Sequence, residues 1–319
     1  MRVPQQVSSI ILQMVRSSYI NSNTVHASKR SSSQPSFEFA ELLSLQRKFY
    51  DRFLYPNNIK EAESINSTVF SEDVRDQKSM PKNHCRAFEL IRRFLKVQGR
   101  VSDTRNFVGR ELNTEYIFGL FTPSDSLTII GRPVGPYEII QFTANQNIAA
   151  ATTRINFLFP SFGNISLPIT IDTWFTYNDA KEISQYDVVF RWFGYLLKEL
   201  LLSVDSDPTK AQTKATQLLA NSICSTHTKY CNGTNSQYDS PNDCYNFLTK
   251  EIRFGESFEL GMNTLLCRNV HEIMIKFRPD VHCSHIGKSG GGQCMDDYTY
   301  TQKVNEQYFT NSPWLPDII

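Results

Sequence analysis

The stretch ITIDTWFTYNDAKEISQYDVVFRW, residues 169–192, decides the fold class, because it contains two alternating segments joined by turn-forming residues. Apolar and polar side chains alternate over 169–177 and again over 183–192, which is the period of a β-strand. The connecting residues 178–181 have the chemistry of a hairpin loop. We therefore predict an antiparallel hairpin, and one face of its second strand carries Tyr186, Val188, Phe190 and Trp192.

Helical and extended segments surround this hairpin. Apolar residues recur near the 3.6-residue period in the segments predicted as helices, and short runs rich in β-branched and aromatic residues mark the segments predicted as strands. Gly99 is expected to end the second helix. The predicted helices cover 37–54, 84–97, 137–151 and 257–276, and the other predicted strands cover 116–121, 126–130 and 155–159.

Length and charge limit the classes of protein. The chain has 319 residues, which suggests two domains or one domain with an appendage. Its 33 basic and 32 acidic side chains argue against a nucleic-acid binder with a broad basic surface. No run of about 18 apolar residues occurs, so we expect no membrane span. We predict a targeting or disordered segment over 1–34, an α+β domain over 35–204 and a Cys-rich extension over 205–319.

Six of the seven cysteines lie within residues 224–294, which predicts a set of disulfides whose pairing the sequence leaves open. Three Asn-x-Ser/Thr sequons accompany them, and together they favour the secretory pathway or secretion. The alternative is a mitochondrial address, because residues 1–37 contain Arg and Ser and no acid. The predicted disulfide cysteines are Cys224, Cys231, Cys244, Cys267, Cys283 and Cys294, and the predicted glycosylation sites are Asn66, Asn164 and Asn232.

Three segments carry a resemblance to a known superfamily. LQRKFY at 45–50 with FSEDV at 70–74, GRPVGPYEIIQF at 131–142 and the hairpin at 171–187 are similar to parts of the NTF2-like, or SnoaL-like, α+β cone. The resemblance covers about residues 40–200. The tail, with NTLLCR at 263–268 and RPDVHC at 278–283, resembles Cys-rich extensions of uncharacterised fungal-type proteins.

The resemblance implies a curved antiparallel sheet around helices, with an apolar cavity at the wide end of the cone. Members of the superfamily use such a cavity as lyases, isomerases or cyclases, or as binding or dimerisation modules, so the fold leaves function open. We expect the cavity to bind a small apolar molecule. The aromatic residues predicted to line it are Trp174, Tyr186, Phe190 and Trp192.

A cofactor-independent lyase or isomerase is the first alternative. Asp172 or Asp187 would act as the acid or base, and His84 or a histidine supplied by the tail would be the histidine that such enzymes pair with an aspartate. The competing interpretation makes Asp172 a hydrogen-bonded strand residue and pairs Asp187 with Arg191 on the same strand face. A structural module that forms a homodimer through the open sheet face is the second alternative.

The tail contains four of the six histidines, which raises the question of a metal site. The cysteine spacings match no structural zinc module, and thiols in an oxidising compartment pair with each other. We therefore expect no metal and no cofactor. Arg268 and Glu272 are spaced as a surface ion pair on one helix.

Overall fold

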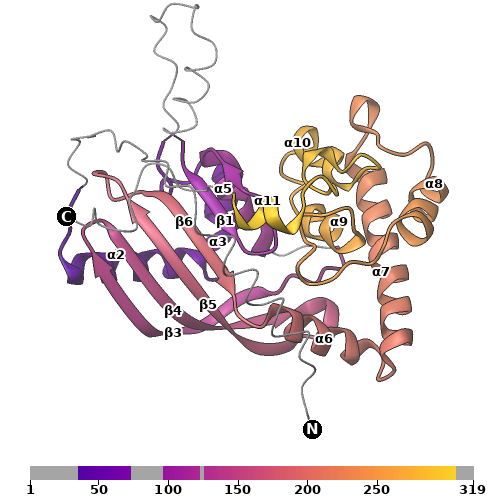
Figure 1. Ribbon diagram of the computed structural model, residues 1–319. Helices are drawn as coiled ribbons and strands as arrows, with labels where there is room; N and C mark the ends of the chain where they lie inside the picture. Colours follow the sequence, from indigo (N-terminus) through magenta and orange to yellow (C-terminus); the bar gives the residue numbers. More distant parts are fainter. Residues whose placement is uncertain (1–34, 73–95, 123–125, 307–319) are drawn as a thin grey trace, which may run out of the picture. The chain divides into compact units, whose positions relative to one another are not determined.

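Six strands form one sheet in the computed structural model, which describes residues 35–72, 96–122 and 126–306. The order across the sheet is β2-β1-β6-β5-β4-β3. Figure 1 labels these strands except β2. Only β1 and β6 pair in parallel among these strands. The bounds are β1 Gln98–Val101, β2 Phe107–Val108, β3 Arg132–Asn145, β4 Ile148–Phe159, β5 Ile165–Tyr177 and β6 Ile183–Phe190.

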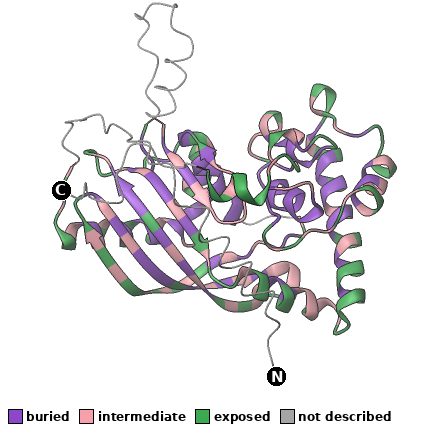
Figure 2. Ribbon diagram, viewed as in Figure 1, coloured by how far each residue is buried: buried purple, intermediate pink, exposed green. Residues whose placement is uncertain are grey.

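The predicted hairpin is confirmed as β5 and β6, which pair antiparallel with Trp174 opposite Asp187. The Asn178 side chain accepts a hydrogen bond from the Glu182 backbone N–H at 2.9 Å and so closes the connecting loop. The inward face of β5 carries buried side chains, whereas Asp172 and Trp174 lie on the outward face. Figure 2 shows this alternation along the strands of the sheet. The buried inward residues of β5 are Ile169, Ile171, Thr173 and Phe175.

The helix predicted over 137–151 is wrong, because these residues belong to the β3–β4 hairpin. A bulge between Ile139 and Gln141 shifts the register. The bulge places Ile139 and Phe142, three residues apart, against the same core. Apolar residues on one face of a bulged strand therefore reproduce the spacing of a helix.

The strands predicted over 116–121 and 126–130 are also absent from the described sheet. Tyr116 instead lies near the end of helix α5 (Arg110–Ile117). A 3₁₀ turn at Gly119–Phe121 follows this helix. In the second segment, side chains accept the hydrogen bonds of backbone N–H groups that a neighbouring strand would otherwise accept. Leu127 donates to Ser222 and Ile129 donates to Asn269.

Helix α2 (Phe39–Phe53) matches the predicted first helix and packs against β3 and β4. Its Phe49 ring meets Phe175 of β5 edge-on at 4.7 Å between centroids. Helix α3 (Asn57–Ser64) follows, and most of the helix predicted over 84–97 lies outside the described residues. The described cone is thus a curved sheet around a helix, which is the NTF2-like α+β fold.

The second half of the chain is helical. Helix α7 (Pro208–Tyr230) was not predicted, because Ser, Thr and Asn obscure its apolar face. Asp207 caps its start by accepting from Thr209 and Lys210. The helix predicted over 257–276 is shorter in the structure, where it begins only at Leu265. Thr264 caps this start by accepting a hydrogen bond from the Cys267 N–H. The remaining helices are α6 Phe193–Val204, α8 Pro241–Asn246, α9 Leu265–Glu272, α10 Pro279–Ile286 and α11 Tyr300–Val304.

All six tail cysteines pair, as predicted. Cys224 bonds Cys244, Cys231 bonds Cys283, and Cys267 bonds Cys294. Cys224 lies in α7 and Cys231 directly follows this helix, so the first two bonds attach α8 and α10 to α7. Cys85 lies outside the described residues. Within the described ranges, none of the helices combines the length and apolar character that a membrane crossing needs.

Candidate functional site

An apolar cavity of about 80 Å³ lies on the inward face of the sheet. Phe49 and Phe53 from α2 line it together with Phe157 and Ile171 from the sheet. The extension contributes Leu260 and Val270, so both halves of the chain form the wall. An engineered cavity of about 150 Å³ holds benzene. The present cavity therefore takes a single-ring molecule only when wall side chains move.

Tyr50 and Thr173 are two of the residues with polar atoms that line this cavity. Thr173 accepts a hydrogen bond from Gln46 at 2.9 Å. The Tyr50 hydroxyl is buried and makes no hydrogen bond of ordinary geometry. Burial raises the pKa of Tyr50, although Thr153, Thr173 and Gln46 lie close enough to lower it in part. The phenol is therefore protonated at neutral pH.

The turn after β1 contributes Ser102, Asp103 and Thr104 to the wall. Asp103 has a positive φ of 70°, and burial raises the pKa of its carboxyl. Aromatic and aliphatic side chains dominate the remainder of the lining. The cavity therefore combines a largely apolar surface with a few polar groups, which is the usual character of a small-molecule site.

The four aromatic residues expected in the pocket have different positions. Phe190 lines the cavity. Tyr186 is buried but packs elsewhere in the core, against the Phe70 ring at 5.8 Å. Trp174 is 46% exposed and Trp192 is 71% exposed, and neither lines the cavity. Trp174 points outward because it alternates with the buried Thr173 and Phe175 along β5.

The two candidate catalytic aspartates lie outside the cavity lining and bind arginines. Asp172 accepts from Arg191 at 2.5 Å and from Thr152 at 2.7 Å. Asp187 forms an ion pair with Arg100 of β1. The expected Asp187–Arg191 pair is therefore wrong, because the parallel strand β1 brings Arg100 opposite Asp187. His84 lies outside the described residues.

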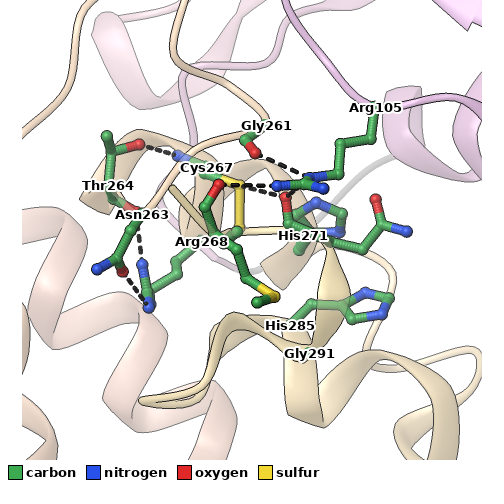
Figure 3. Close-up of a disulfide and its surroundings, with 12 residues drawn as sticks. Arg105, Gly261, Asn263, Thr264, Cys267, Arg268, His271, His285 and Gly291 are labelled. Atoms are coloured by element: carbon green, nitrogen blue, oxygen red, sulfur yellow. Dashed lines mark hydrogen bonds between the residues drawn. A yellow bond between two sulfur atoms is a disulfide. The ribbon is translucent and has the colours of Figure 1, made fainter. Parts of the chain in front are cut away.

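A second cluster of polar side chains lies where α5 meets α9 and α10. Tyr116 bonds His271 Nδ1 at 2.7 Å, and His282 Nε2 lies 3.1 Å from Glu115 Oε2. His285 Nδ1 lies 3.3 Å from His282 Nδ1. All five side chains are buried, and His285 is the most exposed of them at 6%. Figure 3 shows His271 and His285 beside the Cys267–Cys294 disulfide.

Sequence reasoning missed several of these residues. Tyr50 lies on the apolar face of α2 and reads as a core position. Tyr116 fell in a segment predicted to be a strand, and Glu115 directly precedes that segment. The His282-x2-His285 spacing was the available signal, because residues three apart share one face of a helix. His271 joins them only through the packing of α9 on α10.

The three sequon asparagines are all exposed. Asn66 follows α3, Asn164 lies in the β4–β5 connection and Asn232 follows α7. These positions are accessible for a modification, and each lies next to a helix or strand end.

The fold and cavity define an α+β cone joined to a disulfide-crosslinked helical extension. Residues 47–80 and 77–188 match the BfoA N-terminal domain, and residues 189–297 match the BfoA family C-terminal domain. The chain therefore belongs to the BfoA family. The two matches meet between residues 188 and 189, within the last residues of β6.

Relatives of similar length are known from two Aspergillus species. The bifonsecin B biosynthesis cluster protein A of Aspergillus brasiliensis is 47% identical over 288 residues, which cover 89% of each chain. The aurasperone B biosynthesis cluster protein A of Aspergillus niger is 47% identical over 285 residues, 88% of this chain and 85% of the relative.

Solved structures share the general architecture at low identity. A candidate SnoaL-like polyketide cyclase from Jannaschia sp. is 9% identical, with a TM-score of 0.32, and the match covers 57% of this chain and 100% of that chain. The designed NTF2-fold protein NT-9 is 9% identical, with a TM-score of 0.29, over 52% of this chain and 96% of the design. Neither likeness bears on activity.

Proposed function

We propose that this protein binds a small, mostly apolar molecule in the cone cavity and acts in a biosynthetic pathway. The observation that carries this proposal is the largely apolar cavity whose wall includes Tyr50, a buried residue whose hydroxyl makes no hydrogen bond of ordinary geometry. A buried polar group without a partner costs about 1–3 kcal/mol, and a ligand that accepts its hydrogen bond removes that cost. The names of the Aspergillus relatives support a place in biosynthesis.

The positions of the aspartates favour binding over the lyase alternative. A general acid or base must reach the reacting atoms within hydrogen-bond distance. Asp172 and Asp187 instead hold Arg191 and Arg100, and neither side chain lines the cavity. The secretory pathway is the proposed location, because the three disulfides and exposed sequons suit an oxidising compartment.

Phenol and toluene test the proposal as a matched pair of single-ring probes. Their binding to the full chain is measured by calorimetry, and we expect phenol to bind more tightly because its oxygen can accept from Tyr50. Tyr50→Phe should weaken phenol binding by about 3- to 10-fold, the value of one net hydrogen bond. Toluene binding should not weaken.

Val304→Ala serves as the control, because Val304 is exposed and lies outside the cavity lining. The thermal stability of the ligand-free Tyr50→Phe variant should equal or exceed that of the parent. Equal affinity of both probes for the parent and for Tyr50→Phe, or no binding of either probe, would contradict the proposal.

A further inference from the structure

Three buried imidazoles gather between helices α9 and α10. His271 comes from α9, and His282 and His285 come from α10. Their exposed fractions are 3%, 0% and 6%. Each offers one ring nitrogen to a group in which the nitrogens lie within 4.8 Å of one another. The ligand-binding proposal gives these histidines no role.

The spacing of two of the nitrogens suits a metal ion. His282 Nδ1 and His285 Nδ1 are 3.3 Å apart, slightly beyond the usual length of a hydrogen bond. Zinc binds imidazole nitrogens at about 2.0–2.1 Å in a tetrahedron, whose edges are then about 3.3–3.4 Å. The pair already has this separation, and a His271 ring nitrogen lies within 4.8 Å of the other two ligand atoms.

Neighbouring groups orient the rings as metal ligands require. Glu115 Oε2 lies 3.1 Å from His282 Nε2, which holds the ring proton there and leaves Nδ1 with its lone pair toward the cluster. The Tyr116 hydroxyl lies 2.7 Å from His271 Nδ1, and in the tautomer in which Nδ1–H donates to it, Nε2 has its lone pair free to bind. A carboxylate behind a metal-binding histidine is a recurring second layer of such sites.

The cluster is also enclosed by protein. All three rings are buried, and the buried side chain of Glu115 lies next to His282. Imidazole nitrogen is one of the ligand types that zinc prefers.

We propose that His271, His282 and His285 bind one Zn²⁺ ion, with Glu115 holding His282 in position. Among the described residues, no fourth His, Cys, Asp or Glu joins this group, so water fills the remaining position. The ion would fasten α9 to α10. Through Tyr116, which also lines the cavity, it would steady one part of the cavity wall.

The test uses the full chain with its disulfides intact, after a chelator has removed any bound metal and dialysis has removed the chelator. Zn²⁺ is titrated by calorimetry, and Co²⁺ serves as a spectroscopic probe. We expect one ion per chain and the visible absorption of four-coordinate Co²⁺ without a thiolate charge-transfer band. His285→Phe, which keeps a ring in place, should abolish binding, and Glu115→Gln should weaken it by about 10- to 100-fold.

His227→Gln is the matched control, because His227 is a tail histidine outside the cluster that accepts from the Gln237 N–H. Its ion stoichiometry should match that of the parent. No binding by the stripped parent would show a merely hydrogen-bonded trio and overturn the proposal. Unchanged affinity in folded His285→Phe or a thiolate band would overturn it as well. If His285→Phe does not fold, unchanged affinity in Glu115→Gln decides against it.

Discussion

Glu272 is 1% exposed and has hydroxyl and amide side-chain donors around its carboxyl in place of a cation. Ser222 and Thr226 donate to Oε1 at 2.7 Å, and Asn269 donates to Oε2 at 3.0 Å. The surface pair expected with Arg268 does not form, because Arg268 is buried and donates to the Gly287 and Thr264 carbonyls. Helical spacing predicted the pair, but packing of α9 between α7 and α10 buries both residues.

Burial raises the pKa of Glu272 to about 7, with the hydroxyl and amide donors lowering it in part. The folded pKa exceeds the unfolded value of 4.5, so this residue's stabilising contribution is full below pH 4.5 and is lost as the pH rises through 7. Glu272→Gln removes this loss, which amounts to about 3 kcal/mol. We expect the variant to gain stability relative to the parent between pH 4.5 and 8, measured by urea unfolding.

Glu251→Gln is the control for this prediction, because Glu251 is exposed. Its stability relative to the parent should stay nearly constant over the same pH range. A Glu272→Gln variant whose relative stability is equally flat would show that the carboxyl titrates normally in the folded protein.

At the scale of elements, the sequence indicated periodic segments well and their packing partners poorly. The hairpin of β5 and β6 and helix α2 follow directly from alternation and from the 3.6-residue period. The bulge in β3 gave that strand a helix-like spacing of apolar residues. The polar composition of α7 obscured its helical period. The cavity-lining role of Tyr50 depends on contacts with the distant residues Thr153 and Thr173, which no local pattern records.

Gly99 illustrates the same limit, because its role comes from tertiary packing. It was expected to end a helix, but it lies in β1 between β2 and β6. A Cβ at this position would lie 2.1 Å from both Asn113 Oδ1 and the Tyr186 ring. We expect Gly99→Ala to lower the free energy of unfolding by about 1–3 kcal/mol or more through overpacking, as measured by denaturant unfolding.

Gly119→Ala provides the comparison, since the atoms nearest to its added Cβ lie at 3.7 Å, an ordinary contact. It should shift the unfolding midpoint much less than Gly99→Ala does. Equal shifts would mean that β1 moves aside at little cost and that the close approach to Tyr186 does not constrain it.

At the scale of the molecule, the helical extension depends on its cross-links. The chain separations closed by the three disulfides are 20, 52 and 27 residues. Loops of these lengths correspond to about 3–4 kcal/mol of stabilisation for each bond in the chain-entropy model. The combined loss of the three bonds would remove a large part of the free energy of unfolding of a folded domain, which is about 5–15 kcal/mol. Since Leu260 and Val270 of the extension line the cavity, the site depends on the same bonds.

The compartment of synthesis should therefore decide whether the protein folds. Expression through a eukaryotic secretory pathway should yield chains with three disulfides and glycans at Asn66, Asn164 and Asn232, detected by intact mass before and after glycosidase treatment. The same chain made in a reducing cytosol should unfold at much lower denaturant concentration. The Asn→Gln triple variant should lose the glycan mass and still keep the disulfides, because all three asparagines are exposed. A reduced, unglycosylated chain of equal stability would instead place the working protein in a reducing compartment, where its six tail cysteines would stay thiols.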